Sequence, residues 1–189
     1  TAYQNTGPGV DCWVNELIWR EFYRYVVFHF PRVSKNQCFK ANYENIPWRN
    51  NTKHYQAWCE GKTGYPIVDA AMQQLLTTGF MHNRLRMIVA MFFCKDLHLE
   101  WRLGEAFFMQ HLIDADLASN NGGWQWSAST GTDAAPYFRI FNPLTQSERF
   151  DPDAKFIKTY LPILKDSAAK DIHQIIGLPK DYPKIIVNH

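Results

Sequence analysis

The segment Cys12–Phe30, CWVNELIWREFYRYVVFHF, decides the secondary-structure class of this chain. Its apolar residues recur three and four positions apart, which is the spacing of an amphipathic helix, until Pro31 ends the pattern. Asp11 stands directly before the segment and fits an N-cap. We therefore expect one long helix here, preceded by a loop over residues 1–10.

The rest of the chain shows the same helical periodicity, punctuated by glycine and proline, and strand-like alternation is nearly absent. The segment 82–98 is apolar around most of its circumference, so it should be a buried central helix. A glycine-rich turn is expected after residue 119. The pattern predicts an all-α fold in a single domain with no internal repeat. The further helices expected are 52–61 closed by Gly61, 66–79 opened by a proline and closed by Gly79, 104–119, and a late surface helix within 152–164.

The composition excludes several classes of protein. With 46% apolar and 20% charged residues, the chain is neither disordered nor fibrous, and 189 residues suit one globular domain. The formal net charge of +2 is too small to indicate nucleic-acid binding by itself, because binding to a polyanion depends on local clusters of lysine and arginine. Any site for a polyanion must therefore be a local patch.

The four cysteines lie far apart, with neither a CxxC pair nor a cysteine–histidine spacing typical of a metal site. Free thiols in a reducing compartment follow, and no metal is expected. No apolar run approaches the roughly 20 residues that span a bilayer, and no signal-like segment opens the chain. We expect a cytoplasmic protein with no membrane partner. Because the chain starts without methionine, we expect a fragment of a longer protein.

Polar side chains share faces with apolar ones on two of the expected helices. Trp13, Glu16 and Arg20 recur at i, i+3 and i+7. Their spacing alone favours a surface ion pair between Glu16 and Arg20 over a tryptophan that helps the core. Arg86 lies within the apolar central segment, and a buried arginine must find a carboxylate or several other acceptors.

Asp114 and Asp116 supply candidate carboxylates. Two residues apart on a helix they would point in different directions, so they should take different partners. One could pair with Arg86 while the other accepts hydrogen bonds from a ligand, or both could be helix-end charges in solvent. Further on, the paired Gly122 and Gly123 indicate a sharp turn or a close backbone approach to a ligand. Spacing alone supports a helical domain with a polar pocket.

Several longer motifs are more specific. The chain reads WVNELIWREFYR, GYPIVDAAM, MHNRLRM, KDL, EWR, LIDADLASNNGGWQW and ASTGTDAAPYFRIFNP in this order. Over nearly its whole length it resembles the C-terminal FAD-binding domain of the DNA photolyase and cryptochrome family, most closely the class I cyclobutane pyrimidine dimer photolyases. The resemblance implies a multi-helical FAD-binding fold. It also implies a deoxyribodipyrimidine photo-lyase, in which excited reduced FAD passes an electron to a pyrimidine dimer flipped out of DNA.

The resemblance also implies roles for individual residues. Glu16 would stabilise charge on a thymine carbonyl, Asn120 would sit at flavin N5, and Asp114 would pair with Arg86 beside the isoalloxazine. The flavin would be lined by Trp13, Glu16, Arg20, Asn83, Arg86, Asp114, Asp116 and Asn120. The DNA side would comprise Glu16, Trp19, Asn83, Arg84, Met87, Trp126, Arg139 and Gln146. An electron relay to the surface would run through Trp124, Trp101 and Trp48.

Other branches of the family imply other functions. Photolyases for the (6-4) lesion carry histidine at the positions of Asn83 and Met87, and plant cryptochromes typically carry aspartate at the position of Asn120. Repair of cyclobutane dimers is therefore favoured over a cryptochrome-type blue-light sensor. A helical DNA-interaction domain without flavin is a third interpretation.

The family pattern also includes parts that have no counterpart in residues 1–189. These parts are an N-terminal α/β antenna domain and a first stretch of the FAD domain with a phosphate clamp. We expect residues 1–189 alone to bind FAD weakly or not at all and to lack repair activity, whereas the whole protein would bind FAD as a monomer. The sequence does not identify the antenna pigment.

Overall fold

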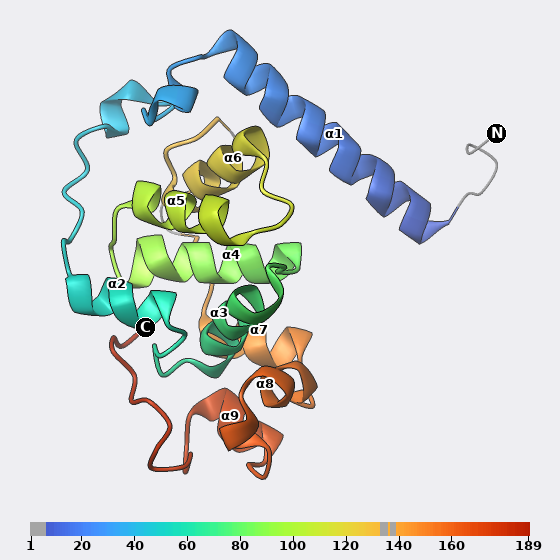
Figure 1. The fold of residues 1–189 in the computed structure, drawn as a ribbon, viewed down its shortest axis with the longest axis vertical. Helices are drawn as coiled ribbons and strands as arrows, with labels where there is room; N and C mark the ends of the chain where they lie inside the picture. Colours follow the sequence, from blue (N-terminus) through green and yellow to red (C-terminus); the bar gives the residue numbers. More distant parts are fainter. Residues whose placement is uncertain (1–6, 133–135, 137–138) are drawn as a thin grey trace.

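The computed structural model describes residues 7–132, 136 and 139–189 (Figure 1). The predicted all-α class is confirmed, since every regular element in the described part of the chain is helical. Short 3-10 turns occur at Val33–Lys35, Ala41–Tyr43 and Pro162–Leu164, and Phe92–Asp96 forms a π-helical turn. The α-helices are α1 (Pro8–His29), α2 (Thr52–Cys59), α3 (Pro66–Thr78), α4 (Asn83–Met91), α5 (Trp101–His111), α6 (Leu117–Ala128), α7 (Pro143–Phe150), α8 (Lys155–Tyr160) and α9 (Ala169–Gln174).

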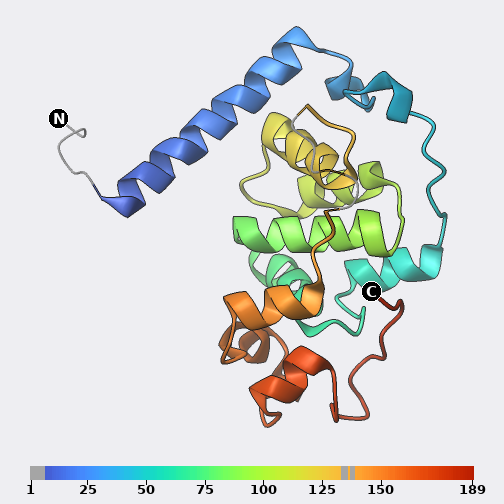
Figure 2. The same cartoon turned by 180° about the vertical axis from the view of Figure 1, so that it is seen from behind.

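The helix α1 extends from a body formed by the other helices (Figures 1 and 2). It starts at Pro8, so residues 8–10 are helical rather than loop, because proline suits the first turn of a helix. It ends at His29, ahead of Pro31, as expected. None of its residues is buried, and Trp13 and Phe28 remain 64% and 79% exposed. Trp13, which its helical spacing predicted to help the core, is therefore on the surface.

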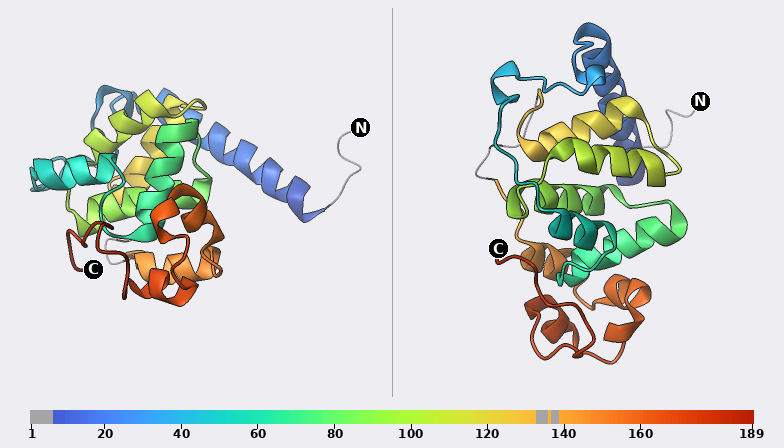
Figure 3. Two further views of the ribbon diagram at one scale, coloured as in Figure 1. Left: turned by 60° about the horizontal axis from the view of Figure 1, so that its bottom comes forward. Right: turned by 60° about the vertical axis from the view of Figure 1, so that its left-hand side comes forward.

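The body is layered, with α5 and α6 on one side of α4 and α3 on the other (Figure 3). The predicted central helix is confirmed, because Leu85 and the run 88–91 of α4 are buried. Trp58 of α2 lies at the centre of the core, where its indole N–H donates to the Val89 carbonyl oxygen over 3.1 Å. Large rings surround it, including Phe93 and Trp124 with ring centroids 4.7 and 6.0 Å away.

Other predicted boundaries are also wrong. The expected helix 104–119 is two helices, because α5 ends at His111 and Asp116 caps α6 by accepting the backbone N–H of Ser119 over 2.9 Å. Gly122 and Gly123 lie inside α6 instead of forming a turn. The late helix also stops early, since Pro162 lacks the N–H that would continue α8.

A buried carboxylate ties the C-terminal segment to the start of α3. Asp69 is fully buried and accepts hydrogen bonds from the backbone N–H groups of Thr63 and Gly64 and from the Tyr182 hydroxyl, which is 2.7 Å away. Burial raises the pKa of Asp69 to about 6, although these hydrogen bonds oppose the shift. The contribution of Asp69 to stability is therefore complete below its usual pKa and is lost as the pH rises through about 6.

Candidate functional site

The position of α1 depends on one close contact with α6. A Cβ atom on Gly122 would lie 2.1 Å from Cδ1 of Tyr23, so only glycine lets the tyrosine ring approach the α6 backbone this closely. Near this contact, Arg24 of α1 lies 3.7 Å from a carboxylate oxygen of Asp116 at the start of α6. The sequence predicted a sharp turn or a close approach of a ligand at the paired glycines, whereas the close neighbour of Gly122 in the structure is a side chain of α1.

The Arg86–Asp114 ion pair connects α4 to the loop between α5 and α6. Nη2 of Arg86 donates to both carboxylate oxygens of Asp114, over 2.9 and 2.8 Å, and Nε of Arg86 donates to the Met81 carbonyl oxygen over 2.7 Å. The loop is held in turn by a backbone hydrogen bond from Ile113 to Gly79 over 2.9 Å. The pairing predicted for a buried arginine is confirmed, although Arg86 is half-buried.

Asp116 takes different partners from Asp114, as predicted. The expected reason, that both residues lie on one helix and point in different directions, is wrong. Both residues lie in or at the end of a loop, and Asp116 acts as an N-cap rather than standing inside a helix. Burial alone would raise the pKa of Asp116, but the hydrogen bonds from Ser119 and the charges of Arg24 and Arg20 lower it below its usual value. Asp116 is therefore firmly ionised at neutral pH, and Arg20 of α1 lies within its electrostatic reach.

The N-terminal half of α1 presents the remaining α1 residues of the predicted site to solvent. Trp13, Glu16, Trp19 and Arg20 are all exposed. Within the described ranges no ion pair joins Glu16 to Arg20, so the surface pair favoured by spacing does not form. Trp19 instead stacks on Tyr23, with ring centroids 6.0 Å apart. The structure shows no hydrogen bond or ion pair from Trp13 or Glu16 to the Arg86–Asp114 pair among the residues it describes.

Asn120 belongs to a buried polar network that spacing did not predict. Its amide nitrogen donates to the backbone carbonyl of Glu105 on α5 over 2.9 Å, while Asn121 donates to the Glu105 carboxylate over 2.8 Å. Asn121 in turn accepts from Gln125 over 2.8 Å. Burial raises the pKa of Glu105, with the Asn121 hydrogen bond opposing it. The Asn120 amide is thereby held in one orientation by α5.

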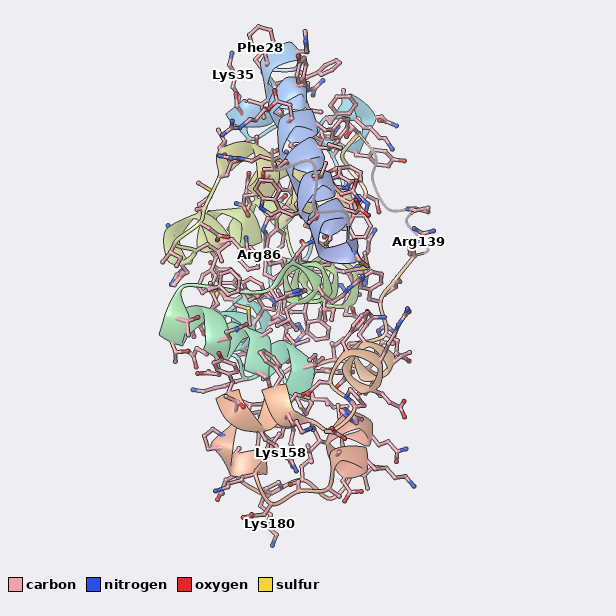
Figure 4. All side chains as sticks on the ribbon, turned by 90° about the vertical axis from the view of Figure 1, so that its right-hand side faces the viewer. Phe28, Lys35, Arg86, Arg139, Lys158 and Lys180 are labelled. Carbon is pink, nitrogen blue, oxygen red and sulfur yellow. The ribbon has the colours of Figure 1, made fainter. Side chains whose placement is uncertain are left out.

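The residues predicted for the DNA side come from several elements, with Glu16 and Trp19 on α1, Asn83, Arg84 and Met87 on α4, Trp126 on α6, Arg139 after α6 and Gln146 on α7. His82 caps α4 by accepting the backbone N–H of Arg84 over 3.1 Å, while Asn83 is exposed and Met87 half-buried. Trp126 and Gln146 are half-buried, and Arg139 is exposed at the edge of the molecule (Figure 4). The motif positions 133–135 and 137–138 lie outside the described residues.

The three tryptophans of the predicted relay differ in burial. Trp124 and Trp101 are buried, whereas Trp48 is half-buried against the core. Trp124 comes close to the helix that carries Trp101, because a Cβ on Gly104 of α5 would lie 2.1 Å from Cη2 of the Trp124 ring. Trp48 is followed by Arg49, whose backbone N–H donates to His98, three residues before Trp101. These contacts draw the segments together, and among the described rings Trp124 packs against Trp58, Phe93 and Phe108.

A cluster that could hold a metal ion and a helix that could span a membrane are both absent from the described part of the chain. No cluster of three or more His, Cys, Asp or Glu side chains there could hold a metal ion. Among the described helices, none is both long and apolar enough to cross a membrane. All four cysteines are free, as predicted.

We predict opposite effects for alanine at the two neighbouring glycines of α6. Gly122→Ala should lower the free energy of unfolding by about 1–3 kcal/mol, because its Cβ would overlap the Tyr23 ring. Gly123→Ala, which meets nothing within 4 Å, should raise it by about 0.5–1 kcal/mol. Denaturant unfolding of both variants measures the difference. Equal stability of the two variants would contradict the contact between α1 and α6.

The sequence and the fold are similar to those of known proteins. A family model described as the FAD binding domain of DNA photolyase matches residues 13–189. Deoxyribodipyrimidine photo-lyases of Salmonella typhimurium and Escherichia coli are each 58% identical over 189 residues, covering 97% of this chain and 40% of their own length. A solved archaeal photolyase from Sulfolobus tokodaii, which contains two FAD molecules, has a TM-score of 0.91 and 46% identity, covering 99% of this chain and 42% of its own. This chain therefore belongs to the family of FAD-binding domains of DNA photolyase.

Proposed function

We propose that this chain is the C-terminal FAD-binding part of a longer photolyase that repairs cyclobutane pyrimidine dimers in DNA under light. The proposal rests on the place where α1, α4 and the α5–α6 loop come together. There Arg86 of α4 pairs with Asp114 of the loop. Arg24 and Arg20 of α1 lie near Asp116 at the start of α6. The chain spans about 40% of the length of the curated relatives it matches, so the activity belongs to the longer protein.

The residues at this meeting point suit the polar edge of a flavin. Arg86 and Asp114 together carry no net charge and offer both donors and acceptors. Asp116, which is ionised, can accept a hydrogen bond from a ring N–H group. Asn120 is oriented through its amide nitrogen, so its carbonyl oxygen stays available on the other side. Trp13, Glu16, Arg20 and Asn83, all exposed, would complete the lining.

Reduced FAD supplies the excited-state electron, and the protein supplies placement and electrostatics. Trp126 would stack on the flipped dimer, while Asn83, Arg84, Met87, Arg139 and Gln146 would hold it and the DNA beside it. Extruding a lesion costs less than extruding a paired base, which gives part of the selectivity. Glu16, in its protonated form, would donate a hydrogen bond to a thymine carbonyl and so stabilise the negative charge that develops there. Trp124, Trp101 and Trp48 would pass electrons inward from the surface.

The same residues would also suit a flavin-free DNA-interaction domain or a blue-light sensor. Membership in an FAD-binding family argues against a flavin-free DNA-interaction domain. A blue-light sensor would share the flavin site, but the relatives named here are deoxyribodipyrimidine photo-lyases, which supports repair. We further propose that the whole protein acts as a monomer in the cytoplasm.

Repair of a dimer-containing oligonucleotide by the full-length protein under blue light tests the proposal. Glu16→Ala should lower the quantum yield of repair by roughly tenfold or more, since a hydrogen bond to a charged group contributes about 1.5–3 kcal/mol. Flavin absorbance should stay largely unchanged. Glu21→Ala is the matched control, because Glu21 is also an exposed carboxylate of α1. Wild-type yield in Glu16→Ala at saturating substrate would exclude the proposed role of Glu16, and no light-dependent repair by the unmodified protein would exclude the function.

A second test concerns the relay. In the full-length protein, Trp48→Phe should abolish or strongly slow the photoreduction of oxidised FAD, because phenylalanine is much harder to oxidise than indole. Repair by chemically pre-reduced protein should be nearly unchanged, and phenylalanine keeps most of the apolar volume, so the fold should survive. Transient absorption under blue light, paired with a repair assay under dithionite, measures both. Normal photoreduction in the variant would remove Trp48 from the relay.

A further inference from the structure

The guanidinium group of Arg102, in the first turn of α5, lies over the ring of Trp101. The guanidinium carbon is 4.7 Å from the ring centroid. Trp101 is the middle tryptophan of the proposed relay, and in the described part of the chain no cation lies over the ring of Trp124 or Trp48. A fixed positive charge therefore stands at one step of the relay.

Three acceptors hold this guanidinium group in place. Its Nε donates to the Asn36 carbonyl oxygen over 2.6 Å, Nη1 donates to the Glu100 carboxylate over 2.9 Å, and Nη2 donates to the Glu44 carboxylate. Glu44 is held in turn, because its other oxygen accepts the backbone N–H of Cys38 over 2.9 Å. The charge over the Trp101 ring is thus fixed by the fold before any electron moves.

Trp101 has no means of shedding a positive charge by losing a proton. Its side chain is fully buried, and no described oxygen or nitrogen atom accepts a hydrogen bond from its indole N–H. An oxidised Trp101 would therefore keep both its proton and its charge, and the guanidinium group of Arg102 would repel that charge at close range. Trp48 differs, because it is half-buried and water can take its proton.

Glu44 and Glu100 oppose the repulsion between Arg102 and an oxidised Trp101. Their side chains are 36% and 26% exposed, against 21% for Arg102. Water screens exposed charges more strongly than buried ones. Because Arg102 also lies directly over the ring, its charge outweighs those of the two carboxylates at Trp101.

We propose that Arg102 is a positioning residue of the relay, which raises the energy of oxidised Trp101 so that the oxidised state moves on to Trp48. This inference rests on the proposed function, in which the relay returns electrons to FAD. Trp101 gives one electron to oxidised Trp124 and receives one from Trp48. Trp48 then loses its indole proton to water and regains an electron from an external thiol.

The test uses the full-length protein carrying Trp48→Phe, in which Trp124 and Trp101 alone share the oxidised state. Transient absorption after a blue flash measures how long a tryptophan stays oxidised. Adding Arg102→Gln should lengthen this lifetime about tenfold, since losing a cation over a ring favours oxidised Trp101 by about that factor over Trp124, to which the electron returns fastest. Arg102→Lys, which keeps the charge, should lengthen it less.

Arg32→Gln is the matched control, because Arg32 lies 3.9 Å from the same Glu44 carboxylate but over no described tryptophan ring. It should leave the lifetime unchanged. Glu44→Gln should shorten the lifetime, because it removes a charge that offsets Arg102. Flavin absorbance shows that each variant still folds. Ultraviolet resonance Raman of the tryptophan bands in the dark checks the ring contact itself, and only changes at Arg102 should alter it.

Two outcomes separate this inference from the function on which it rests. If Trp48→Phe blocks photoreduction but neither Arg102→Gln nor Glu44→Gln changes the lifetime, the role of Arg102 is overturned and the relay stands. Normal photoreduction in Trp48→Phe alone would overturn the relay, and the role of Arg102 with it.

Discussion

The close contact between the Tyr23 ring and the backbone of Gly122 determines where α1 stands, and the proposed site depends on that position. Since no residue of α1 is buried, α1 has little packing of its own to hold it. The absence of a side chain at Gly122 lets the two helices approach, and the Arg24–Asp116 ion pair follows nearby. The rest of α1, with Glu16 and Arg20, is oriented by this one anchored stretch.

The arrangement of charges then divides the proposed site into two regions. On the side proposed for the flavin, cations and carboxylates are matched, as in the pair formed by Arg86 and Asp114. On the side proposed for DNA, Arg84 lies over the rings of Phe141 and Phe150 and pairs with no described carboxylate. The small net charge of the chain hides this separation, because the matched groups cancel and only the unmatched ones attract a polyanion.

Much of the fold could be predicted from the sequence, because stop signals coincide with real helix ends. Gly79, for example, closes α3 in the left-handed conformation that glycine tolerates. The pattern failed where packing overrides local preference, as at Gly122 and Gly123 inside α6. It also failed at the loop before Asp116, because helical spacing happens to continue through that loop.

The site was predictable only in part. The need of a buried arginine for a carboxylate left both Asp114 and Asp116 as possible partners of Arg86, and only the motif resemblance selected Asp114. Contacts between different helices, such as Glu105 of α5 with Asn121 of α6, leave no spacing signal. Tyr23 was missed for the same reason, and the individual roles came from the motif resemblance. The short helices α7 and α9 were also missed, since six to eight residues show too little periodicity.

The fixed position of α1 can be measured directly by pulsed dipolar electron paramagnetic resonance. One spin label is attached to the exposed native Cys12 of α1 and the second to Lys170→Cys on α9, with Cys59 replaced by alanine. A single narrow distance distribution is expected, which broadens in Gly122→Ala and stays narrow in Gly123→Ala. A broad distribution in the protein with both native glycines would contradict the account, because α1 would then have no fixed position from which to complete the site.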